Sequence, residues 1–326
     1  MMVHERLEYM DVAKCIAIFL VCIGHSYFLS PTGHSSIARA WIYSFHMPLF
    51  MLLCGFFSVN SFKLSFSALL IKKSRTLLLP IISFTLLSCI IYIIGDVPDL
   101  CSACRSELIG GMWFLRTLFF CYFIVYAVKK TRLPDWLCCL LSCLAFMAIP
   151  KGSFLQTNYL LLFFWTGYFT NKYKEKYYKY RQYVTAIALL AYVLFGRITM
   201  PEVLAYGLVG NLNAVYIQYI TAISMSFVLM GFAYYFSRIS SMSFIVRRMS
   251  KVGRYTLGIY GVQTILIERI TYCSFNRQII GVDAVITDNL LIPLIGILYG
   301  LFCYVLVWIT SHSKTCNLLL YGNQYQ

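Results

Sequence analysis

Long apolar runs recur along the whole chain, and short segments rich in polar and charged residues separate them. An α-helix needs roughly 20 apolar residues to cross the hydrocarbon core of a bilayer, and shorter runs are accommodated by snorkelling side chains or local thinning of the lipid. The pattern therefore predicts an all-α integral membrane protein of about ten transmembrane helices. The runs lie at 11–29, 42–60, 77–94, 112–128, 135–149, 156–171, 183–196, 214–236, 255–270 and 289–311.

Residues 198–213 do not fit this pattern. Their sequence, ITMPEVLAYGLVGNLN, mixes apolar residues with Pro, Gly and Asn. A loop, a re-entrant segment and an additional half-span are all compatible with it.

Lys and Arg are distributed unevenly among the connections between the runs. Because positive charge is retained on the cytoplasmic side of a membrane, the alternation places the even-numbered connections and both termini in the cytoplasm. The even-numbered connections carry Lys63, Lys72, Lys73, Arg75, Lys129, Lys130, Arg132, Lys172, Lys174, Lys176, Lys179, Arg181, Arg238, Arg247, Arg248, Lys251 and Arg254. The odd-numbered connections carry only Arg39, Arg105, Lys151, Arg197, Arg269 and Arg277.

The composition agrees with a membrane protein. Hydrophobic residues make up 60% of the chain and charged residues 12%, whereas soluble domains carry roughly 25% charged residues. The spans use most of the length, so residues 1–326 are expected to form a single multi-span membrane domain. A net charge of +15 in a soluble protein would suggest nucleic acid. Here most of the Lys and Arg residues lie in the predicted cytoplasmic connections, as expected of a membrane protein. The bilayer, and not nucleic acid, is therefore the expected partner.

Most of the 13 Cys lie inside apolar runs, where the thiol behaves as a small hydrophobe. Cys101 and Cys104 form a CxxC pair in a polar loop, but zinc would need two more ligands and none lies near in the sequence. A disulfide or two idle thiols is expected there, and no metal site. The first apolar run has no small-residue cleavage site after it, so we expect it to act as a signal anchor.

Ionisable residues inside apolar runs are costly and usually functional. The first run contains Asp11, Lys14 and His25. Lys14 and His25 are separated by about three helical turns, so they share one helix face about 16 Å apart along the axis. The predicted topology puts Lys14 at the cytoplasmic end and His25 toward the outer end.

Three further residues are predicted at the depth of His25. The second and fourth runs descend from the outer side, which places His46, Trp113 and Arg116 in the same outer third. This arrangement predicts a polar site that opens toward the outside. Ordinary structural roles remain open, because Lys14 can snorkel to the headgroups, His46 can bond a neighbouring helix and Trp113 can belong to the interfacial belt.

The residues around these positions resemble acyltransferase family 3, whose members are multi-span enzymes that O-acetylate sugars and polysaccharides. The resemblance is greatest to the branch of fucose 4-O-acetylase and its relatives, and it covers nearly the whole chain. The motifs that carry it are RLEYMDVAK with IAIFLVCIGHS (6–26), FHMPLFMLLCGFF (45–57), KKSRTLLLP (72–80), MWFLRTLFF (112–120) and GRYTLGIYGVQTILI (253–267).

This sequence departs from the family pattern at two positions. Lys14 stands where many members have Arg, and Gln263 stands where many have His. The first substitution occurs in the fucose-acetylase branch. The second implies that acceptor handling differs in this chain, or that some activity is lost.

The resemblance implies transfer of an acetyl or similar short acyl group from acyl-CoA, the co-substrate, to a hydroxyl of a sugar or cell-envelope polysaccharide at the bacterial inner membrane. Imidazole titrates in the range that proton removal from a hydroxyl needs. His25 is therefore the candidate base, or a nucleophile that carries the acyl group. The resemblance supports Lys14 and Arg75 as donor-binding residues. We expect His46 or Arg116 to stabilise the oxyanion, and Trp113 and Gln263 to contact the substrate.

Other classes remain to be weighed. A transporter or flippase for a lipid-linked sugar is disfavoured because the two halves show no sequence repeat. A polysaccharide polymerase is disfavoured because the outer connections are short, and a structural subunit because His25 and Arg116 lie inside apolar runs. The acceptor stays open among capsule, O-antigen, a peptidoglycan precursor and a secreted small molecule.

Overall fold

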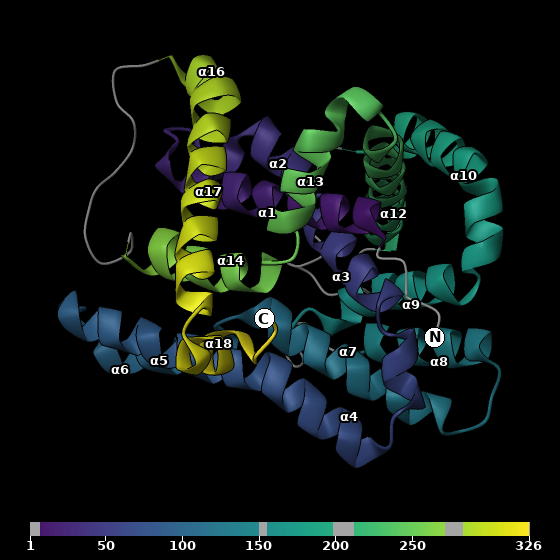
Figure 1. Cartoon of the computed structure of the whole chain (residues 1–326), viewed down its shortest axis with the longest axis horizontal. Helices are drawn as coiled ribbons and strands as arrows, with labels where there is room; N and C mark the ends of the chain where they lie inside the picture. The colour runs from purple at the N-terminus through teal and green to yellow at the C-terminus, as the bar shows by residue number, and fades with distance from the viewer. Residues whose placement is uncertain (1–6, 150–154, 198–211, 271–282, 326) are drawn as a thin grey trace.

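The computed structural model describes residues 7–149, 155–197, 212–270 and 283–325 (Figure 1). Within these ranges the chain is helical and forms no β-sheet. Most of the ambiguous segment 198–213 lies outside the described residues. The helices are α1 (Glu8–Ser26), α2 (Ile37–Tyr43), α3 (His46–Phe56), α4 (Phe66–Lys73), α5 (Leu79–Ile94), α6 (Leu100–Gly110), α7 (Trp113–Lys129), α8 (Asp135–Met147), α9 (Thr157–Lys172), α10 (Lys174–Phe195), α12 (Leu212–Ser237), α13 (Ser243–Val252), α14 (Thr256–Gln263), α16 (Ala284–Ile286), α17 (Ile292–Ser311) and α18 (Lys314–Tyr321).

Every predicted apolar run contains helix, which confirms the all-α class. Among the described residues, six helical segments are long and apolar enough to cross a membrane. The protein is therefore a multi-pass membrane protein, while the count of about ten spans and the cytoplasmic termini stay predictions. The six segments are Glu8–Leu29, Ile37–Phe56, Phe66–Ile94, Leu100–Lys129, Val215–Ser237 and Ala284–Ser311.

Helix α1 lies at the centre of the described fold and packs against α3, α12, α13, α14 and α17. Figure 1 shows α4 and α5 as one long rod along the lower edge, beside α6 and α7, with α17 crossing in front of α1 and α14. Among the described residues, three π-helical turns interrupt the regular helices, at Ser74–Leu78, Thr264–Ile270 and Thr287–Leu291. Such turns frequently occur at functional sites.

Small residues let α3 and α9 pack with their backbones in contact. A Cβ on Gly55 would lie 2.0 Å from the carbonyl oxygen of Phe164, and one on Gly167 would lie 1.9 Å from that of Leu52. Glycine at both positions is therefore required by the close approach, as is common between membrane helices.

Five described helices, α4, α6, α13, α16 and α18, lie outside every predicted apolar run. Helix α6 occupies the connection that holds Cys101 and Cys104, and both residues are free thiols. Helix α18 follows the last apolar run and packs against α5, α14 and α17. The described residues contain no group of His, Cys, Asp and Glu side chains that could hold a metal ion.

Candidate functional site

His25 stands in the last turn of α1 and pairs with a carboxylate from a distant part of the chain. Its Nδ1 lies 2.8 Å from Oε1 of Glu268, which belongs to the π-turn Thr264–Ile270. Both side chains line a cavity of about 390 Å³, which we call the His25 cavity. Because the carboxylate engages Nδ1, the opposite ring nitrogen is left to exchange a proton with a substrate.

The Glu268 carboxylate is itself held in place. Its second oxygen, Oε2, lies 3.1 Å from Nη1 of Arg269, and Nε of Arg269 lies 2.8 Å from Oε2 of Glu107. Tyr92 donates a hydrogen bond of 3.3 Å to the same Glu107 oxygen. This chain of contacts joins α5, α6 and the π-turn, so it fixes the carboxylate that orients His25.

Gln263 lies within hydrogen-bonding reach of Glu268, five residues away across the π-turn. Its Nε2 donates to the Thr264 hydroxyl at 3.0 Å. Its Oε1 is buried and has no hydrogen-bond partner within the described part of the chain. A buried acceptor of this kind is costly. Gln263 is fully buried and is not among the described residues that line the His25 cavity.

An aromatic ring separates His25 from His46. The Tyr43 ring lies 6.4 Å from the His25 ring and 4.8 Å from the His46 ring, centroid to centroid. His46 is buried, and its Nδ1 bonds the carbonyl of Ile42 at 2.8 Å. Arg39, which lines the His25 cavity, sits over the Tyr43 ring at 4.2 Å. His46 is thus near His25 but is not among the described residues that line the cavity.

Helix α7 begins away from the His25 cavity. Nε of Arg116 donates to the carbonyl of Gly111 at 2.7 Å, which braces the turn before the helix. Trp113 packs edge to face on Phe114, with 6.1 Å between ring centroids. The structure brings neither Arg116 nor Trp113 into contact with His25; Phe114 instead lines a second cavity.

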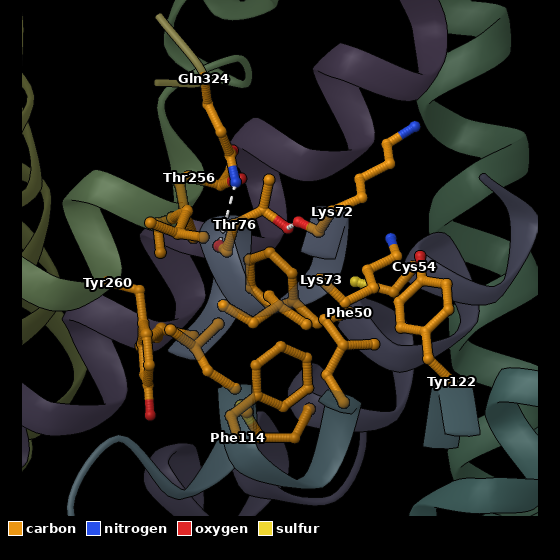
Figure 2. Close-up of a pocket in the computed structure, with 17 residues that line it drawn as sticks. Phe50, Cys54, Lys72, Lys73, Thr76, Phe114, Tyr122, Thr256, Tyr260 and Gln324 are labelled. Atoms are coloured by element: carbon orange, nitrogen blue, oxygen red, sulfur yellow. Dashed lines mark hydrogen bonds between the residues drawn. The ribbon is translucent and has the colours of Figure 1, made fainter. Parts of the chain in front are cut away.

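This second cavity, of about 280 Å³, we call the Lys73 cavity (Figure 2). Figure 2 shows the rings of Phe50 and Phe114 along its floor and the amine of Lys73 beside Cys54 and Tyr122. The Lys73 amine lies 3.5 Å from the centre of the Tyr122 ring. An apolar cavity with a cation at its edge suits a ligand that has an uncharged arm and an anionic end.

The two cavities lie along the same helices. On α1, Val21 lines the Lys73 cavity and Gly24 lines the His25 cavity. Three residues correspond to about 4.5 Å along a helix axis, so the cavities are neighbours. The segment from Thr256 to Glu268 likewise contributes Tyr260 to the Lys73 cavity and Glu268 to the His25 cavity.

Lys14 lies near the start of α1, and Arg75 lies at a separate place. Lys14 pairs with Asp11 at 3.2 Å, and its amine sits 4.1 Å from the centre of the Phe57 ring. Arg254 approaches the same Asp11 carboxylate at 4.0 Å. Arg75 lies on the π-turn Ser74–Leu78 and lines a different surface cavity from Lys73.

The residues that complete the His25 site were not singled out in the sequence. Glu268 is the acidic residue inside the run 255–270, so the rule that an ionisable residue inside a run is functional identifies it. Arg269 was counted only as a connection charge, and Glu107 lies outside every predicted run. No local pattern shows that Glu268 pairs with His25, or that Arg269 joins Glu268 to Glu107.

Comparison with known proteins identifies the family of the chain. The sequence matches the acyltransferase domain family, acyltransferase family 3, over residues 7–312. It is 31% identical over 145 residues to nodulation protein NolL of Mesorhizobium japonicum, an alignment that covers 39% of this chain and 37% of that protein. No solved structure matches the chain significantly. The extent of the family match shows that this chain, with its membrane-spanning helices, belongs to acyltransferase family 3.

Proposed function

We propose that the protein transfers an acetyl or other short acyl group from acyl-CoA to a hydroxyl of a sugar or cell-envelope polysaccharide, at the inner membrane of a bacterium. The observation that carries the proposal is the 2.8 Å contact between His25 Nδ1 and Glu268 Oε1 at the wall of a cavity. An imidazole oriented by a carboxylate is a common arrangement for general-base catalysis of acyl transfer.

In the direct form of this reaction, the free nitrogen of His25 accepts the proton of the acceptor hydroxyl. The hydroxyl oxygen then forms a bond to the thioester carbonyl carbon, and the carbon–sulfur bond to CoA breaks. The imidazolium, stabilised by Glu268, returns the proton to the departing thiolate. The hydroxyl proton thus ends on the CoA thiol, and the step uses no metal or redox partner.

Charge develops on the carbonyl oxygen during this step, and a nearby donor or cation lowers the barrier. Arg39 is the one cationic side chain among the described residues that line the His25 cavity. We assign oxyanion stabilisation to Arg39. His46 packs against the other side of Tyr43 and supports the site from there, and Arg116 bonds Gly111 and holds the start of α7. Gln263 Oε1 accepts a hydrogen bond from a hydroxyl of the sugar. Trp113 packs against Phe114 and supports it in the wall of the Lys73 cavity.

The donor approaches from the predicted cytoplasmic side, where Lys14, Lys72, Lys73 and Arg75 lie in the sequence. Lys72 and Lys73 line the Lys73 cavity, whose wall on α1 includes Ile18 and Val21. Lysine and arginine bind phosphate groups, and the apolar walls suit an uncharged pantetheine arm.

The experiment compares wild-type protein and His25→Ala after reconstitution into lipid vesicles. Radiolabelled acetyl-CoA is the donor, and envelope glycan from a strain that lacks the gene is the acceptor. Wild type should label the glycan and release CoA in equal amounts, and His25→Ala should do neither while inserting normally. Labelling by His25→Ala at the wild-type rate would exclude His25 as base, and failure of wild type to consume acetyl-CoA would exclude the donor.

The same preparation separates direct transfer from an acyl-His25 relay. Without acceptor, a relay leaves label on the protein that hydroxylamine removes, because acyl-imidazoles are readily cleaved. Direct transfer leaves no such label. Mass spectrometry of surface glycans with and without the gene then identifies the acylated sugar.

A further inference from the structure

A third cavity, of about 620 Å³, opens beside the last residues of the described chain. Its walls include the cations Arg75 and Lys314, the imidazole of His312, and the aromatic rings of Tyr255 and Trp308. None of the described residues that line it is acidic. We call it the strap cavity, because residues 314–325, the C-terminal strap, form one side of it.

The C-terminal strap is fastened to the π-turn that holds Arg75. Gly322 adopts a positive φ of 63°, and a Cβ there would lie 2.3 Å from the carbonyl oxygen of Arg75. Gln324 Nε2 donates to the carbonyl of Thr76 at 3.3 Å, as the dashed line in Figure 2 shows. The strap therefore runs directly over the backbone at Arg75 and Thr76.

A second set of contacts fastens the strap to α14. The backbone amide of Gly258 donates to the Tyr325 hydroxyl at 3.0 Å. The rings of Tyr325 and Tyr255 lie 4.5 Å apart, centroid to centroid. Asn317 of α18 bonds the backbone of Tyr325 at both its amide and its carbonyl. Gly258 thus fastens the strap to α14, and Asn317 fixes Tyr325 against α18, the helix that begins the strap.

The strap cavity and the Lys73 cavity adjoin one another. At three separate places in the chain, one residue lines the strap cavity and its direct neighbour lines the Lys73 cavity. The strap, the π-turn and the start of α14 thus form the partition between them. The neighbouring pairs are Arg75 and Thr76, Tyr255 and Thr256, and Asn323 and Gln324.

We propose that the strap cavity binds the phosphorylated nucleotide of the acyl-CoA donor, while the Lys73 cavity takes its pantetheine arm. The inference rests on acyl-CoA as the donor in the proposed function. Arg75 and Lys314 match the phosphates, and the rings of Trp308 and Tyr255 offer faces on which an adenine can stack. A volume of about 620 Å³ lies within the 300–1,000 Å³ typical of ligand pockets.

The assignment has a consequence specific to this chain. The family match ends at residue 312, whereas the strap begins at Lys314. Donor affinity in this protein therefore depends on a segment outside the matched region. The strap also fixes where each part of acyl-CoA lies. The nucleotide lies in the strap cavity, the pantetheine arm in the Lys73 cavity, and the thioester points toward the His25 cavity.

The test is calorimetric titration of the purified full chain in lipid nanodiscs, with CoA and with adenosine 3′,5′-bisphosphate as probes. Arg75→Ala and Lys314→Ala should each weaken binding of both probes about ten-fold, because each removes one charge-assisted contact to phosphate. Lys176→Ala is the matched control, since it removes an equal charge from the exposed face of α10. It should leave both affinities unchanged.

Each outcome has a distinct meaning. If wild type binds CoA and the Arg75→Ala and Lys314→Ala variants bind it equally well, the strap cavity is not the nucleotide site, while the proposed donor stands. If wild type binds neither CoA nor acetyl-CoA, acyl-CoA is not the donor and both proposals are wrong. A ten-fold loss shared by Lys176→Ala would show a general charge effect and would also overturn the site.

Discussion

Glu268→Gln tests the pairing on which the proposed mechanism depends. The substitution keeps the size of the side chain but removes the negative charge that lies 2.8 Å from His25 Nδ1. A hydrogen bond to a charged group contributes about 1.5–3 kcal/mol. If that stabilisation is realised when the imidazole becomes charged in the transition state, kcat should fall about 10- to 150-fold.

The fold should survive this change, because Arg269 keeps its ion pair with Glu107 at 2.8 Å. The assay is release of CoA from acetyl-CoA by reconstituted protein at saturating donor and acceptor. KM for the donor should stay near the wild-type value, since Glu268 lines the His25 cavity and not the Lys73 cavity. Glu175→Gln, which neutralises an exposed carboxylate at the start of α10, serves as the control.

A double variant provides the sharper test. If Glu268 acts only through His25, then His25→Ala with Glu268→Gln should be no slower than His25→Ala alone, because residues that act as a unit are not additive. A wild-type kcat in Glu268→Gln, or a full additive loss in the double variant, would refute the reasoning.

Two further substitutions test the site and the packing that supports it. Gln263→Leu removes the unpartnered Oε1 acceptor, so KM for the acceptor should rise about ten-fold with little change in KM for acetyl-CoA; an unchanged acceptor KM would remove Gln263 from the substrate site. Gly167→Ala forces a Cβ against the Leu52 carbonyl and should destabilise the protein by about 1–3 kcal/mol, measured as a lower Tm in detergent. Gly110→Ala, where a Cβ would meet nothing within 4 Å, should leave Tm unchanged, and equal shifts in both variants would contradict this account.

The helical membrane architecture followed from the sequence because the signal is local. A run of apolar residues can satisfy its backbone in lipid only as a helix, and each predicted run proved to contain one. The run 255–270 was placed in the same way, but its change from α-helix to π-helix after Gln263 was not predicted. That change depends on how the segment packs, which no periodicity of its own residues records.

The candidate site likewise has residues that the sequence predicts and contacts that only the fold determines. The sequence alone identified His25, because an imidazole inside an apolar run is costly enough to require a reason. It also placed His46, Trp113 and Arg116 at one depth, since depth depends only on position along a helix. Depth does not determine which helix faces which, and the structure directs Arg116 to Gly111 and pairs His25 with Glu268.

By itself the sequence determined that this is a helical membrane protein and that its first helix contains an imidazole inside an apolar run. Only the tertiary structure decided the partner of that imidazole, the two neighbouring cavities along α1, and the placement of residues 314–325 over Arg75. The physical reason is that burial and hydrophobic length are properties of a segment. Ion pairs and cavities are properties of segments that meet after folding.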